Sequence, residues 1–106
     1  MTETDDLWRA VHASKAWLDG HNGRDPHEVT LRILKVMEES GEVAAARIGT
    51  LGQNPRKRIH QTDEDTAAEL ADVVITALVA IESLGLDARE TVLTCARKVL
   101  SRISAT

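Results

Sequence analysis

Apolar residues recur three or four positions apart in four segments of the chain, and this spacing predicts four amphipathic helices. The first is expected over residues 4–19, with Gly20 as its stop. The second is expected over residues 26–48, between an N-cap at Asp25 and a stop at Gly49. The apolar stripes of these two helices comprise Leu7, Val11, Ser14 and Leu18 in the first, and Leu31, Leu34, Met37, Ala44 and Ile48 in the second.

The third and fourth helices follow residues 49–61, where glycine, asparagine and proline predict a loop. Thr62 is the expected N-cap of the third helix, which ends before Gly85. Asp87 is the expected N-cap of the fourth, which runs to about Ile103. Nothing resembles a strand hairpin, so the sequence predicts an all-α fold.

The length and composition of the chain indicate one small helical domain. Its 106 residues are expected to form a single domain, 1–106, and a domain of this size buries only roughly 60% of its unfolded surface. Hydrophobic residues make up 42%, but aromatic residues only 2%, with no Phe or Tyr. A core of Leu, Ile, Val, Ala and Met suits closely packed helices. We therefore expect a four-helix bundle, formed largely by the second and third helices and completed by oligomerisation with a partner subunit.

Charge and cysteine content narrow the possible surroundings and partners. The formal net charge of -4 makes nucleic acid an unlikely main partner, because duplex binding depends on a basic surface. A single cysteine, Cys95, fits a cytoplasmic protein, and we expect it to be a small buried apolar residue. No apolar run approaches the roughly 18 residues of a membrane span, and residues 1–7 lack the apolar stretch of a signal peptide.

Two acidic motifs carry the candidate chemistry: Glu38-Glu39-x-x-Glu42 in the second helix and Glu69-x-x-Asp72 in the third. Residues three or four apart share a helix face, so an antiparallel pairing of the two helices brings the motifs together. Carboxylates gathered in this way repel one another unless a cation lies among them. Ligands that offer only oxygen favour Mg²⁺, with Mn²⁺ as a second possibility. The alternative is a solvated helix face on which Glu38 and Glu39 pair with Lys35.

The run Glu-Glu-Ser-Gly-Glu, followed by Glu-Leu-Ala-Asp-Val-Val, resembles the EExxE and ExxD signature of the all-α nucleotide pyrophosphohydrolases. The segment Asn54-Pro55-Arg56-Lys57 and the following His60-x-Thr62-x-x-Asp65 are similar to the MazG-like branch of that superfamily. The resemblance covers 31–81, about half of the chain.

The resemblance implies a MazG-type helical homodimer or homotetramer that hydrolyses a nucleoside triphosphate to the monophosphate and pyrophosphate. It implies Mg²⁺ held by Glu39, Glu42, Glu69 and Asp72. Glu38 is then either an additional metal ligand or a residue that contacts the ligands without binding the metal itself. Either Glu38 or Glu39 positions or deprotonates the attacking water. The alternative is a non-catalytic module that keeps the fold and binds a nucleotide or a partner without turnover.

Substrate-binding candidates lie outside the acidic motifs. Four residues of the predicted loop can clamp a phosphate, or else complement the C-terminal end of the second helix: Arg56, Lys57, Arg58 and His60. Trp8 and Lys15 share a face of the first helix and can contact a base and a phosphate, or else serve as an interface residue and a solvated cation. Members of the superfamily carry Lys or Asn late in the last helix, where this chain offers Lys98 or Arg102.

Overall fold

The computed structural model describes residues 2–105, so the expected domain 1–106 extends by one residue beyond the description at each end. Four α-helices follow one another: α1 (Glu3–Asn22), α2 (Pro26–Leu51), α3 (Asp63–Ser83) and α4 (Ala88–Ser104). The described residues contain no strand. The prediction of an all-α fold with four helices is therefore confirmed.

Three of the expected N-caps are confirmed by their hydrogen bonds. The side chain of Asp25 accepts the backbone N–H of Glu28 at 2.8 Å, and Asp87 caps α4 in the same way. Thr62 and Asp65 form a reciprocal capping box at the start of α3. These side chains satisfy backbone donors that the first turn of a helix leaves free, and so fix where each helix begins.

Two of the expected helix stops are wrong. Gly20 lies within α1, which ends at Gly23 with a φ of 78°. Gly49 lies within α2, which ends at Gly52 in the left-handed conformation with a φ of 66°. In both cases a glycine three residues farther along adopts the positive φ that a helix C-terminus favours. Gly49 serves close packing instead, because a Cβ there would collide with the side chain of Gln61.

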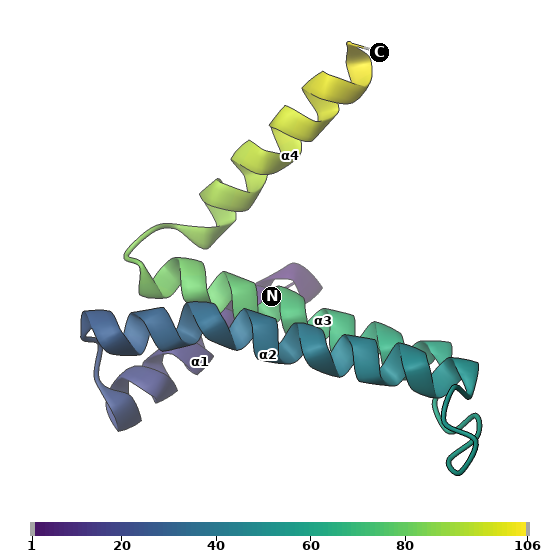
Figure 1. Cartoon of the computed structure of the whole chain (residues 1–106). Coiled ribbons are helices and arrows are strands. Elements are labelled where there is room, and N and C mark those ends of the chain that lie inside the picture. The colour runs from purple at the N-terminus through teal and green to yellow at the C-terminus, as the bar shows by residue number, and fades with distance from the viewer. Residues whose placement is uncertain (1, 106) are drawn as a thin grey trace.

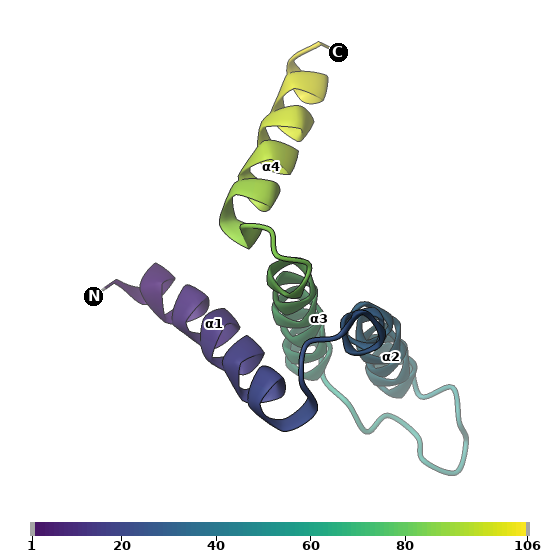
Figure 2. The same cartoon turned by 90° about the vertical axis from the view of Figure 1, so that its left-hand side faces the viewer.

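Helices α2 and α3 form an antiparallel hairpin and lie side by side along most of their length (Figure 1). Helix α1 packs against α3 on the side away from α2 (Figure 2). The buried core cluster lies between α1, α3 and the first turn of α4, and consists of Val11, Leu78, Val79 and Ala88. The core is thus small and aliphatic, as the composition predicts.

A buried arginine joins the three packed helices. The side chain of Arg32, on α2, is only 4% exposed and forms ion pairs with Asp19 of α1 at 2.8 Å and with Glu28 at 2.7 Å. It also donates to the hydroxyl of Ser83 on α3 at 3.1 Å and to the carbonyl of Gly23 at 2.9 Å. Full pairing of this kind compensates for removing the guanidinium from water.

Helix α4 projects away from the other three helices (Figure 1). Every described residue of α4 after Ala88 is exposed. The expected four-helix bundle is therefore not closed within one chain, and the expected burial of Cys95 is wrong because its helix has no neighbour along most of its length. None of the described helices combines the length and the apolar character needed to cross a membrane.

Candidate metal centre and the adjoining cavity

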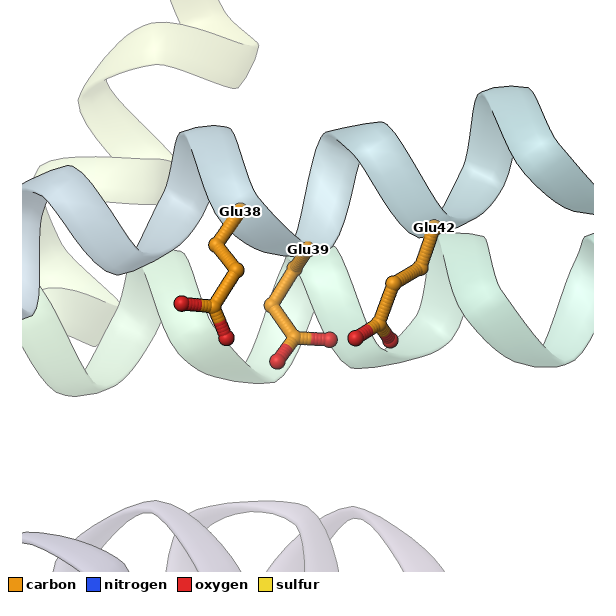
Figure 3. A group of neighbouring side chains, drawn as sticks. All are labelled: Glu38, Glu39 and Glu42. Carbon is orange, nitrogen blue, oxygen red and sulfur yellow. The ribbon is translucent and has the colours of Figure 1, made fainter.

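The hairpin of α2 and α3 brings the two acidic motifs together. Carboxylate oxygens of Glu39, Glu69 and Asp72 lie within 4.8 Å of one another, and so do those of Glu38, Glu39 and Glu42. The three glutamates of α2 point the same way from the helix (Figure 3). Glu39 belongs to both groups and links them. The predicted convergence of the motifs is confirmed, whereas metal binding by these residues stays a prediction.

Burial distinguishes the acids from one another. The side chain of Glu39 is 15% exposed, whereas that of Glu38 is 63% exposed. Glu69 is also half-buried, while Glu42 and Asp72 lie at the surface. The cluster therefore has an inner part between the helices, formed by Glu39 and Glu69, and an outer part open to solvent.

Two of the acids have pKa values raised above that of a free glutamate. Burial, and then the charge of Glu42, raise the pKa of Glu39 above its usual value. The pKa of Glu69 is raised by the same two causes in the same order, and then by a hydrogen bond with Glu42 and by the charges of Asp72 and Glu39. Lys35 opposes the rise at Glu39. A further positive charge among these groups would reduce the repulsion between the carboxylates.

One atom of the cluster lacks a hydrogen bond in the described structure. Oε2 of Glu69 is buried and has no hydrogen-bond partner, and the same holds for Oγ1 of Thr66, one turn earlier on α3. A buried polar atom without a partner is costly, at about 1–3 kcal/mol for a neutral group and more for a charged one. The Glu69 oxygen is thus an available ligand between the two helices.

Lys35 partly neutralises the outer side of the cluster. Its ammonium group bonds to Glu38 and lies 3.8 Å from Glu39. Glu38, the nearer acid, raises the pKa of Lys35. The alternative to a metal site, a solvated helix face on which Glu38 and Glu39 pair with Lys35, therefore describes Glu38 well. It does not account for Glu69 and Asp72, which lie on the other helix.

A cavity of about 430 Å³ adjoins the cluster at Glu42. Its floor is α2 at Ala45 and Ala46, and Lys57 of the loop between α2 and α3 lines its wall. Of the four predicted clamp residues, Lys57 and His60 line the cavity, whereas Arg56 and Arg58 do not. The other residues that line it are Ile48, Gln53, Asn54 and Gln61.

Asn54 shapes this loop. Its side chain accepts the backbone N–H of Arg56 at 3.0 Å, and its carbonyl accepts those of Lys57 at 3.1 Å and Arg58 at 2.8 Å. Arg58 then turns the chain with a φ of 58°, and the N–H of His60 donates to the carbonyl of Gly49 at 3.1 Å. Of these residues, His60 is a predicted phosphate-clamp residue that lines the cavity, whereas Asn54 and Gln61 were not predicted to bind substrate. The Asn-Pro pair is a turn signal that could have indicated an ordered loop.

The remaining substrate-binding candidates do not line this cavity or join the acidic cluster. Trp8 packs against the core and lies under the guanidinium of Arg89, which is 4.9 Å from the ring centroid. Lys15 pairs with Asp19 at 2.7 Å. Lys98 is exposed on the projecting α4. The residues brought together are thus the acids, Lys57 and His60.

No protein-family model, curated protein or solved structure matches this chain. The likeness to the MazG-like enzymes therefore remains that of the short motifs. A functional assignment therefore depends on the geometry of the acidic cluster and the adjoining cavity.

Proposed function

We propose that the chain is a Mg²⁺-dependent nucleoside triphosphate pyrophosphohydrolase of the MazG type, acting as a homodimer or homotetramer. The observation that supports this most is the meeting of Glu39, Glu69 and Asp72 from two helices within 4.8 Å. A cavity that carries a lysine adjoins the same cluster through Glu42. Metal ligands beside a cavity that carries a lysine suit a bound triphosphate.

The residues present fit a hard divalent cation. Glu39, Glu42, Glu69 and Asp72 offer only carboxylate oxygens, which Mg²⁺ and Mn²⁺ prefer. The buried, unpartnered Oε2 of Glu69 and the raised pKa values of Glu39 and Glu69 fit a site in which positive charge is expected. When bound, such a cation neutralises phosphate charge and lowers the pKa of a coordinated water.

The protein side chains then have separate tasks. Lys57 binds a phosphate oxygen in the cavity beside Glu42. Glu38 is the more solvated of the two candidate bases and carries Lys35 as a counter-ion, whereas Glu39 lies in the half-buried centre of the cluster. This difference favours Glu39 as a ligand and Glu38 as the group that accepts a proton from water. Electrostatic interactions between the carboxylates and a bound cation are stronger in the half-buried inner part of the cluster, because less water screens them there.

The test is a panel of ribo- and deoxyribonucleoside triphosphates incubated with the full chain and Mg²⁺, with release of pyrophosphate as the readout. We expect at least one nucleotide to be cleaved to its monophosphate, and we expect Asp72→Asn and Glu69→Gln to abolish cleavage. Glu64→Gln, on the same helix but outside the cluster, is the matched control and should retain activity. Absence of cleavage across the panel contradicts the enzymatic assignment.

A non-catalytic nucleotide-binding module is the second candidate, and the position of α4 favours it. Lys98, the last-helix cation, is on a helix that projects away from the helices that carry the acids (Figure 1). This candidate requires calorimetric binding of a nucleotide in the presence of Mg²⁺ without any release of pyrophosphate. The same panel therefore separates the two functions.

A further inference from the structure

The base of α4 is fixed to the rest of the chain. Ala88 is fully buried, and its backbone N–H donates to Oε2 of Glu82 at 2.6 Å. The other carboxylate oxygen of Glu82 lies 3.1 Å from Nε2 of His12 on α1. The guanidinium of Arg89 lies over the ring of Trp8. These contacts come from α1 and α3, so they set the direction in which α4 leaves the other three helices.

The rest of α4 carries an apolar stripe that nothing in the chain covers. Val92, Ala96, Val99 and Leu100 follow the i, i+4, i+7, i+8 spacing of one helix face, and all four are exposed. Leu100 is 64% exposed. A helix of this length draws most of its stability from packing of its apolar face. The stripe therefore requires a surface outside its own chain.

The area of the chain indicates how large that surface is. The accessible surface is 7708 Å² for a mass of 11.6 kDa. A compact monomer of this mass exposes about 5,800 Å², so the chain exposes about 1,900 Å² more than expected. Its radius of gyration is 16.8 Å, against about 13 Å for a compact domain of this length. Burial of such an excess on two chains falls in the range of obligate homodimers, about 2,000–5,000 Å² in total.

Helix α2 offers a second uncovered stripe. Leu34, Met37, Ile48 and Leu51 share a face of α2 by their helical spacing, and all four are exposed. Met37 is 72% exposed, more than any other large apolar side chain of the described residues. Exposed apolar area of this extent on one helix is typical of a protein interface.

The charges of α4 and of the rest of the chain are opposite. Helix α4 contains four basic residues and one acidic residue, a net charge of +3. Because the whole chain carries -4, the remainder carries -7. By helical spacing, Glu38 lies beside Leu34 at one edge of the α2 stripe, and Arg47 lies beside Leu51 at the other edge. It is therefore the net charges of α4 and of the remainder whose opposite signs favour the encounter of two chains.

We propose that α4 is an exchanged arm, which packs its apolar stripe along the α2 stripe of a second copy of this chain. The partner is a second copy because the excess area matches a dimer interface and because each chain carries both the donor and the acceptor stripe. The proposal rests on the homo-oligomer of the proposed function and specifies its contact surface. Sedimentation tests the contact, whereas release of pyrophosphate tests the activity, so the failure of one is distinguishable from the failure of the other.

Analytical ultracentrifugation of the full chain over a range of concentrations tests the proposal. We expect the wild-type chain to sediment at twice 11.6 kDa or at a higher multiple of it. Leu100→Gln should raise the dimer dissociation constant at least about tenfold, because each of two symmetric contacts loses a buried leucine. Met37→Gln should weaken the dimer in the same way on the receiving stripe.

Ser101→Gln is the matched control, since Ser101 follows Leu100 in sequence, lies outside the stripe by helical spacing and is also exposed. It should leave the dissociation constant unchanged, and circular dichroism should show unchanged helix content in all three variants. A wild-type chain that sediments as a monomer overturns the proposal, as does a dimer that tolerates Leu100→Gln. A dimer weakened by Leu100→Gln but not by Met37→Gln overturns the pairing of α4 with α2.

Discussion

Nη1 of Arg32 donates to Oδ1 of Asp19 across 2.8 Å and so joins the end of α1 to the first turns of α2. The same guanidinium binds Glu28, and its side chain is almost fully buried. Removing it leaves Glu28 partly buried without a cation, and it leaves Asp19 with Lys15 alone. We expect Arg32→Ala to lower the free energy of unfolding by about 3–5 kcal/mol, measured by chemical denaturation.

An exposed arginine on the same helix provides the control for Arg32. Arg47 pairs with Asp63 at 3.5 Å, and both side chains are exposed. Exposed pairs contribute about 0–1 kcal/mol, so Arg47→Ala should change stability by no more than that. Equal losses of unfolding free energy in the two variants would show that the buried Arg32 ion pairs stabilise the fold no more than an exposed pair does.

Asp19 should give the fold an acid-sensitive contact. Hydrogen bonds from Lys15 and then from Arg32 lower the pKa of Asp19 below its ordinary 3.8. A lowered pKa stabilises the folded chain above pH 3.8, and this stabilisation is lost as the pH falls through the folded-state value. We expect Asp19→Asn to be less stable at neutral pH and to lose less stability below pH 3.8. Denaturation curves from pH 2 to pH 7 measure this, and parallel profiles for the two proteins would contradict it.

The contribution of Glu69 to folding stability should depend on pH in the opposite sense to that of Asp19. Its pKa is raised above 4.5, so the folded chain holds the proton more tightly than the unfolded chain. Stability then falls as the pH rises from 4.5 through the folded-state pKa. Without metal at pH 7, Glu69→Gln should therefore be more stable than the wild-type chain.

Added Mg²⁺ should reverse that order. A ligand at a hundred times its Kd stabilises the folded state by about 2.7 kcal/mol, so thermal unfolding of the wild-type chain should shift upward. Glu69→Gln should shift much less, and Glu64→Gln as much as the wild type. Equal shifts in all three would place the cation elsewhere.

Gly49 should not tolerate a side chain. An added Cβ meets Gln61 too closely and lies 3.1 Å from Nε2 of His60, so the loop that lines the cavity must move. We expect Gly49→Ala to cost about 1–3 kcal/mol. Gly20 is helical too but has open space around its Cβ position, and Gly20→Ala should stabilise the chain by about 0.5–1 kcal/mol. Thermal denaturation of the two variants gives opposite signs if this reasoning holds.

Lys57 and Arg56 are neighbours that should differ in kinetics. Lys57 lines the cavity, whereas Arg56 does not. A hydrogen bond to a charged group contributes about 1.5–3 kcal/mol, so Lys57→Ala should raise KM for the triphosphate at least about tenfold. Arg56→Ala should change it little. Steady-state kinetics on the substrate found in the nucleotide panel measure both, and equal effects would remove Lys57 from the site.

The helix starts and the meeting of the acids could be predicted because both depend on local rules. Asp25, Thr62 and Asp87 cap helices through bonds to residues three positions on. Glu39 and Asp72 converge because helical spacing fixes their faces and because α2 and α3 pair antiparallel. The convergence therefore followed from local spacing once that pairing was assumed.

The features that escaped prediction depend on tertiary contacts. Gly49 looks like a helix stop in sequence, but Gln61 packs against it and explains its small size. Arg32 looks like a surface residue until Asp19 and Ser83, far apart in sequence, surround it. The exposure of Cys95 depends on where α4 points, which Glu82 fixes through a backbone bond that no periodicity reveals.

Both tryptophans of the chain lie on α1, and the chain has no tyrosine. Trp8 is half-buried beneath Arg89, whereas Trp17 is largely exposed beside His21. Intrinsic fluorescence of this protein therefore reports on α1 alone. Trp8 dominates any change in emission, because it is the tryptophan that becomes more exposed to water when α1 detaches from α3. An emission shift that precedes the loss of far-ultraviolet ellipticity would reveal that α1 detaches before the α2–α3 hairpin melts, and coincident transitions would show that the helices unfold as one unit.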